Sequence, residues 1–137
     1  MSRTQAGLVA GASLLAVLLA GCQREPMGGP LALQIEANEP VAALQRINEA
    51  GAKCWVRSSD ADFRDLHLVP ELDTSVGRPR LLLLKKGKAE GLPVLVIEAA
   101  GSPVTLTTYG PLASTRTGGR VNADIMRWSS GRTTCRS

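Results

Sequence analysis

Two hydrophobic patterns alternate along the chain, and each predicts a different element. Apolar residues at every second position are typical of a half-buried strand, whereas a spacing of three or four is typical of a helix. Alternation, or a short apolar run between turn residues, predicts strands at 31–35, 54–57, 66–70, 80–85, 93–98 and 104–107. Among these, 54–57 has the least regular pattern, so we expect a sheet of about four or five strands.

The helical spacing occurs twice. It is marked by Val41, Leu44, Ile47 and Ala50 in the first segment, and by Val121, Ile125 and Trp128 in the second. The first pattern predicts a helix over 39–50, with Asn38 as its cap and Gly51 as its stop. The second predicts a helix that runs to about residue 128 and is ended by Gly131.

The order of these elements predicts an α+β fold. Consecutive strands are joined by loops too short for a crossover, so the sheet is expected to be antiparallel. Two helices flanking a run of strands favour a two-layer sandwich with both helices on one face. The runs at 81–84 and 94–97 are apolar on both sides of their strands. Their second face therefore needs a cover: another segment of the chain, a second protomer or an apolar ligand.

The N-terminus has the three parts of an export signal. Arg3 supplies a positive charge, residues 6–18 are apolar, and the segment ends in Leu19-Ala20-Gly21-Cys22. These last four residues resemble the lipobox of bacterial lipoproteins. The resemblance implies that residues 1–21 are a cleaved signal peptide and that Cys22 becomes the lipid-bearing first residue. Gln23 then favours sorting to the outer membrane.

A retained transmembrane helix is the alternative for this segment. Residues 6–22 are a run of 17 residues without a charge, which is near the short limit for a bilayer about 30 Å thick. After Cys22, residues 22–30 contain two prolines and two glycines, and we interpret them as a short lipidated tether. The remaining residues, 31–137, are expected to form a single small domain close to the membrane.

The two other cysteines, Cys54 and Cys135, are an even pair once Cys22 carries lipid. In an oxidising compartment such a pair usually forms a disulfide, which here would close a loop of about 80 residues and stabilise the domain by about 4 kcal/mol. A reactive thiol is the alternative, but no Cys-x-x-Cys spacing supports it.

The charged residues include two sets of basic side chains, one in the centre of the chain and one near the C-terminus. The net charge of +4 becomes +3 when Arg3 is removed with the signal. The C-terminal group is Arg116, Arg120, Arg127, Arg132 and Arg136, opposed in sequence only by Asp124. The central group is Arg78, Arg80, Lys85, Lys86 and Lys88. Each group could contact anionic headgroups, but solvated helix faces and strand ends explain both. Export excludes nucleic acid as a partner.

The sequence offers few groups for catalysis. His67 is the only histidine, with Asp65 two residues away, and Cys54 would have to leave its disulfide to serve as a nucleophile. The nearby acids Asp60, Asp62, Asp65, Glu71 and Asp73 lack calcium-loop spacing. We therefore expect no enzyme, no metal and no cofactor. The aromatic residues Trp55, Tyr109 and Trp128 are expected in or near the core, since an exposed one would mark a contact surface.

The stretch from Cys54 to Cys135 resembles small envelope lipoproteins that have no assigned activity. The matching motifs are Pro70-Glu71-Leu72, Gly77–Arg80, Tyr109–Leu112 and Arg127-Trp128. We therefore expect a non-enzymatic interaction or accessory module at the periplasmic face of the outer membrane, held by its lipid and meeting an envelope protein. A carrier of an apolar or anionic lipid-like ligand is the alternative, and an enzyme using His67 is the third. Oligomeric state is left open.

Overall fold

A computed structural model describes residues 28–87 and 91–136. The expected signal peptide, Cys22 and the first part of the tether lie outside these residues. The strands are β1 (Leu31–Gln34), β2 (Leu66–Glu71), β3 (Arg80–Lys85), β4 (Leu95–Ala100) and β5 (Thr105–Tyr109). The helices are α1 (Pro40–Gly51) and α2 (Arg116–Ser129), with a π-helical turn η1 (Ala52–Val56) and a 3-10 turn η2 (Pro111–Ser114).

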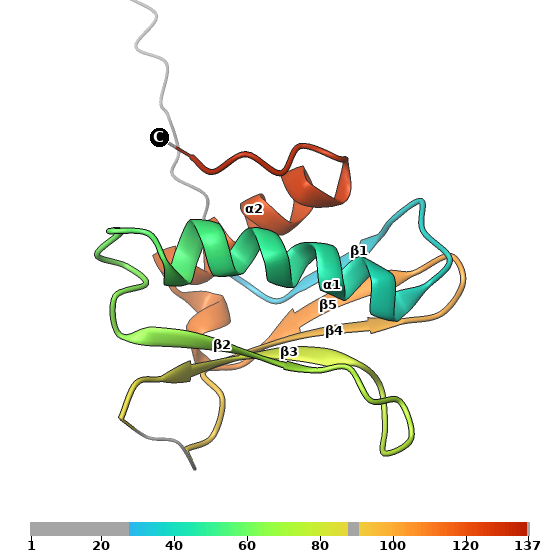
Figure 1. Ribbon diagram of the computed structural model, residues 1–137, viewed down its shortest axis with the longest axis horizontal. Coiled ribbons are helices and arrows are strands. Elements are labelled where there is room, and N and C mark those ends of the chain that lie inside the picture. The colour runs from blue at the N-terminus through green and yellow to red at the C-terminus, as the bar shows by residue number, and fades with distance from the viewer. Residues whose placement is uncertain (1–27, 88–90, 137) are drawn as a thin grey trace, which may run out of the picture.

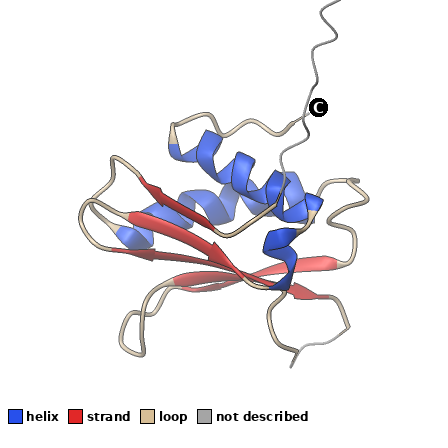
Figure 2. Cartoon of the chain, turned by 180° about the vertical axis from the view of Figure 1, so that it is seen from behind, coloured by secondary structure: helices blue, strands red, loops and turns tan. Residues whose placement is uncertain are grey.

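The five strands form one antiparallel sheet in the order β1-β5-β4-β3-β2. Strands β2 to β5 are neighbours in chain order and form a meander. Strand β1 pairs with β5 and forms the other edge of the sheet. Figures 1 and 2 show both helices on the same face of this sheet. The predicted α+β class and two-layer arrangement are thus confirmed. Among the described residues, no helix combines the length and apolar character needed to cross a bilayer.

The main core lies between the sheet and the helices. Alternate residues of the central strands face the helices, and Leu81, Leu83, Leu95 and Ile97 are completely buried there. Helix α1 contributes Leu44 and Ile47, and α2 contributes Val121, Ile125 and Trp128. These are the apolar positions on which the helical spacing was based, so the burial of one stripe explains where both helices pack.

The predicted strand at 54–57 is wrong, because this segment continues α1 as η1. Gly51 does not stop the helix: its backbone is helical, and an added Cβ would lie 2.9 Å from the Trp55 ring. The residue therefore allows close packing. Continuing the helix buries both Cys54 and Trp55. A helical turn thus satisfies the hydrophobic residues that resembled a strand.

Two smaller expectations also differ. Asn38 does not cap α1: Glu39 stands at that position without a side-chain bond, and Asn38 Oδ1 accepts a hydrogen bond from Ser102 Oγ at 3.2 Å. Strand β2 continues through Pro70, which pairs with Leu81, rather than ending there. Proline is tolerated because β2 is an edge strand and needs no donor on its open side.

Residues 28–30, which the sequence assigns to the tether, pack on the domain. Gly28 lies so close to η2 and the start of α2 that an added Cβ would be 2.0 Å from the Thr115 carbonyl oxygen. Asn122 Nδ2 donates to the Gly29 oxygen at 2.7 Å, and Leu31 N donates to Thr108 Oγ1 at 3.0 Å. The part of the tether before the docked residues is therefore only 22–27.

Candidate functional site

The face of the sheet opposite the helices, which we call the open face, has its own small apolar cluster. Leu82, Leu84 and Val96 are 6–8% exposed and pack with the half-buried Val69. This cluster explains why the β3 and β4 runs are apolar on both sides. Of the three covers considered, the single chain suffices, since these side chains are buried without a second protomer or a ligand.

Two ion pairs lie beside this cluster. One joins β3 to β2, and the other joins the loop before β3 to β4. Arg80 Nε lies 2.6 Å from Glu71 Oε2, and Arg78 Nη1 lies 3.0 Å from Glu98 Oε1. The hydrogen bond that Arg80 donates to Glu71 raises the pKa of the guanidinium above its ordinary value. The ion pair and the hydrogen bond hold the Arg80 guanidinium against β2.

These pairs border an open hollow of about 680 Å³ between the sheet and the β2–β3 loop. Val76 in that loop is 89% exposed. Tyr109 is 43% exposed on the open face, and its hydroxyl donates to Glu98 Oε2 at 3.3 Å. The expectation that Tyr109 lies in the core is therefore wrong: residues at its position in the register face away from the helices.

The open face combines features of a protein-binding surface. Exposed Val76 and two oriented arginines line the hollow, and the exposed Tyr109 reaches its border through the bond to Glu98. Tyrosine and arginine are enriched where proteins bind one another. Its carboxylates, Glu71 and Glu98, are both bound to arginines. The arrangement thus offers contact area together with charged groups held in place by their partners.

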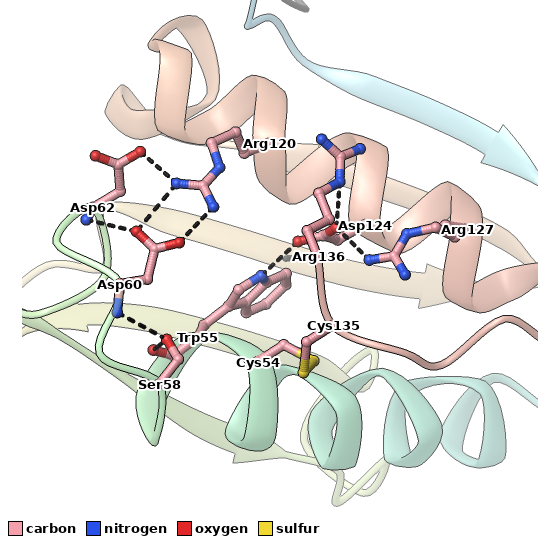
Figure 3. A network of polar contacts seen from close by, with 10 residues as sticks. All are labelled: Cys54, Trp55, Ser58, Asp60, Asp62, Arg120, Asp124, Arg127, Cys135 and Arg136. Carbon is pink, nitrogen blue, oxygen red and sulfur yellow. Dashed lines mark hydrogen bonds and ion pairs between the residues drawn. A yellow bond between two sulfur atoms is a disulfide. The ribbon is translucent and has the colours of Figure 1, made fainter.

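A second polar cluster lies on the helical side of the sheet (Figure 3). Arg120 of α2 reaches the η1–β2 loop, where Nη2 contacts Asp60 Oδ2 at 2.5 Å and Nη1 contacts Asp62 Oδ2 at 2.6 Å. The guanidinium also lies over the Phe63 ring, 5.3 Å from its centroid. This fork fixes a loop that has no regular structure of its own.

Asp124 forms the centre of the second half of this cluster. It is 4% exposed and accepts a hydrogen bond from Trp55 Nε1 at 3.0 Å. Arg127 Nη2 lies 2.7 Å and Arg136 Nε 3.1 Å from its Oδ1 atom. A buried carboxylate with three donors is satisfied. We infer a structural role, in which Asp124 ties the C-terminal tail to α2 and η1.

The tail is also held covalently, by a disulfide between Cys54 and Cys135. These are the two cysteines that the sequence analysis pairs. Figure 3 shows the bridge beside the Trp55–Asp124 contact. Cys54 is therefore oxidised and buried on the helical side, whereas His67 pairs with Leu84 in the register of the open face. The structure does not bring His67 and Cys54 together.

The expected solvated helix face is wrong for Arg120 and Arg127, whose side chains are 24% and 19% exposed, whereas Arg136 in the tail is 42% exposed. Arg120, Arg127 and Arg136 bind carboxylates. The acids Asp60 and Asp62 are about 60 residues away in sequence, so no local pattern could reveal the pairing. In the described ranges, no group of three or more His, Cys, Asp or Glu residues is arranged to hold a metal ion.

The Asp60–Arg120 pair makes stability depend on pH in a defined direction. The hydrogen bond from Arg120 lowers the pKa of Asp60 below 3.8 in the folded chain. Its stabilisation is therefore complete above pH 3.8 and is lost as pH falls through the lowered value. We expect Arg120→Gln to reduce the free energy of unfolding by about 1 kcal/mol at pH 6 and by less at pH 2.5.

Urea unfolding at both pH values measures this effect. Arg132→Gln is the matched control, because it removes the same charge from an exposed tail residue. A difference between Arg120→Gln and wild type that stays constant down to pH 2.5 would contradict the assigned pair.

Comparison of the chain with protein-family models, curated proteins and solved structures finds no match to any of them. The function therefore has to be argued from the residues and their geometry alone.

Proposed function

We propose that the chain is a lipid-anchored envelope protein that acts as a non-enzymatic interaction module, with the open face as its contact surface. The observation that carries the proposal is the exposure of Tyr109 and Val76 beside the Arg78–Glu98 and Arg80–Glu71 pairs. An aromatic anchor with a polar tip and a surrounding set of oriented charges suits a protein partner.

The lipid anchor is the other half of the proposal and is supported by the sequence. Leu19-Ala20-Gly21-Cys22 resembles a lipobox, and acylation of Cys22 would hold the domain at the membrane, with the outer membrane favoured by Gln23. The Cys54–Cys135 disulfide suits an oxidising compartment such as the periplasm. A carrier of lipid-like ligands is less favoured, because the chain itself covers the Leu82–Leu84–Val96 cluster.

Site-specific photo-crosslinking in the native envelope tests the contact surface. A photoreactive amino acid replaces Val76 or Tyr109 of the full chain, and Gln45, exposed on α1, is the matched control. We expect the same discrete adduct from positions 76 and 109 and none from 45. Equal adducts from all three positions, or no adduct from the open face, would contradict the proposal.

The anchor has an independent readout. Intact mass spectrometry of the wild-type chain from membranes is expected to show loss of residues 1–21 and a diacylglycerol on Cys22. Cys22→Ser should abolish both changes. An unprocessed wild-type chain that retains Met1 would remove the lipoprotein part of the proposal and leave the contact surface to be judged by crosslinking.

A further inference from the structure

We propose that one end of the domain rests on an anionic phospholipid surface, so that the rest of the domain has a fixed orientation at the membrane. This inference rests on the proposed acylation of Cys22. It follows from two observations: where the docked part of the tether leaves the domain, and how the charged side chains are distributed between the two ends of the sheet.

The register places the tether at a definite end, which we call the linker end. Leu31, the first residue of β1, pairs with Thr108 near the end of β5. The end of β5, the start of β4, the end of β3 and the start of β2 lie at this same end of the sheet. Figure 1 shows the η1–β2 and β3–β4 connections on this side, and the β2–β3 loop on the other, the far end.

The reach of the tether then keeps the linker end near the bilayer. Gly28 is docked on η2 and α2, so six residues, 22–27, precede it from the acylated position onward. At 3.3–3.6 Å per residue, this segment spans at most about 20 Å. The tether therefore keeps the linker end within about 20 Å of the bilayer and sets no such limit on the far end.

Charge separates the two ends in the same direction. In the strand ends, the loops next to the strands and the first two turns of α2, the described residues of the linker end include twice as many basic as acidic side chains. Its basic residues are Arg57, Arg64, Lys85, Lys86, Arg116 and Arg120, and its acids are Asp60, Asp62 and Asp65. At the far end the described acids are Glu36, Glu39, Glu71, Asp73 and Glu98, against Arg78 and Arg80.

These named residues sum to +3 at the linker end and −3 at the far end, while Arg127 and Arg132, at and beyond the C-terminal end of α2, add positive charge away from the linker end. Basic side chains near an anionic bilayer are attracted to it over roughly one Debye length, about 10 Å at 0.1 M salt. Attraction of the linker end and repulsion of the far end both turn the linker end toward the bilayer. The tether favours the same orientation. The far end, with the hollow and Val76, then faces away from the membrane.

Lipid-headgroup quenching of two fluorescent positions tests this orientation. The mature acylated chain is reconstituted in phosphatidylcholine vesicles containing 30% phosphatidylglycerol and a headgroup nitroxide. A clickable amino acid carries the dye at Ser114, beside Gly28, or at Val76 in the far-end loop. We expect quenching at 114 to exceed that at 76 by at least about twofold at 0.1 M salt, and the ratio to fall at 1 M.

Matched variants separate the two causes. Arg64→Glu with Lys85→Glu should reduce the quenching ratio, whereas Arg46→Glu with Arg132→Glu makes the same change in net charge outside the linker end and should not reduce it. Gly28→Ala should also reduce the ratio, because its Cβ would collide with the Thr115 carbonyl. Gly29→Ala is its control, since no atom lies within 4 Å of the added carbon.

Equal quenching at the two positions, or stronger quenching at 76, would overturn the orientation. A ratio that is unchanged in pure phosphatidylcholine would overturn the anionic contact. Acylation is verified by mass before reconstitution, so a chain without lipid reports failure of the proposed anchor, and an acylated chain without preferred quenching reports failure of this inference alone.

Discussion

Replacing both Cys54 and Cys135 by alanine is expected to lower the free energy of unfolding by about 4 kcal/mol. The bridge joins residues 81 apart, so it removes a large amount of conformational freedom from the unfolded chain. It also holds a tail whose other contacts, Arg136 to Asp124 and Arg127 to the Thr134 carbonyl, lie near the surface.

Urea unfolding with and without reductant measures this contribution. Reduced wild type should unfold at the urea concentration of the double-alanine variant, and reductant should have no effect on that variant. A loss below about 1 kcal/mol would mean that Asp124 and its arginines hold the tail without the covalent bond.

The second large effect is expected for Trp55→Ala, at about 4 kcal/mol. The side chain is 1% exposed and packs between Phe63 and Trp128, with ring centroids 5.6 and 4.8 Å away. Truncation leaves a cavity where α1, η1, the following loop and α2 meet. It also removes the hydrogen bond to Asp124, which leaves one acceptor site of a buried carboxylate unpaired.

Trp55→Phe separates these two contributions, because it keeps an aromatic ring and removes the indole donor. We expect it to cost about 1–2 kcal/mol in chemical or thermal unfolding, less than half the loss from alanine. Equal losses from both variants would assign the effect to the Asp124 bond rather than to packing.

The fold could be predicted where hydrophobic spacing and secondary structure agree. Strand β3 (Arg80–Lys85) has the bounds expected from its apolar run, and α2 buries the stripe of Val121, Ile125 and Trp128. Prediction failed where tertiary packing decided between two local possibilities. Gly51 is a common helix stop, yet here its missing Cβ makes room for the Trp55 ring.

The proposed contact surface could be predicted only in part. Arg78 and Arg80 were recognised as charged neighbours of a central strand, but their pairing with Glu98 and Glu71 depends on strand order. The exposure of Tyr109 depends on which of two faces the helices cover, and β5 alone does not determine this. The Asp60–Arg120 contact joins a loop to a helix that is distant in sequence.

The position of β1 has a consequence for the order in which the domain assembles. Strands β2 to β5 pair through consecutive loops, whereas Leu31 of β1 bonds to Thr108, 77 residues later. Closing so long a segment costs more entropy than closing a hairpin, so we expect the meander to form first. During synthesis or translocation, β1 emerges first but can pair only after β5, the last strand, has emerged. The docking of Gly28 on η2 and of Gly29 on α2 therefore belongs to the final stage of folding.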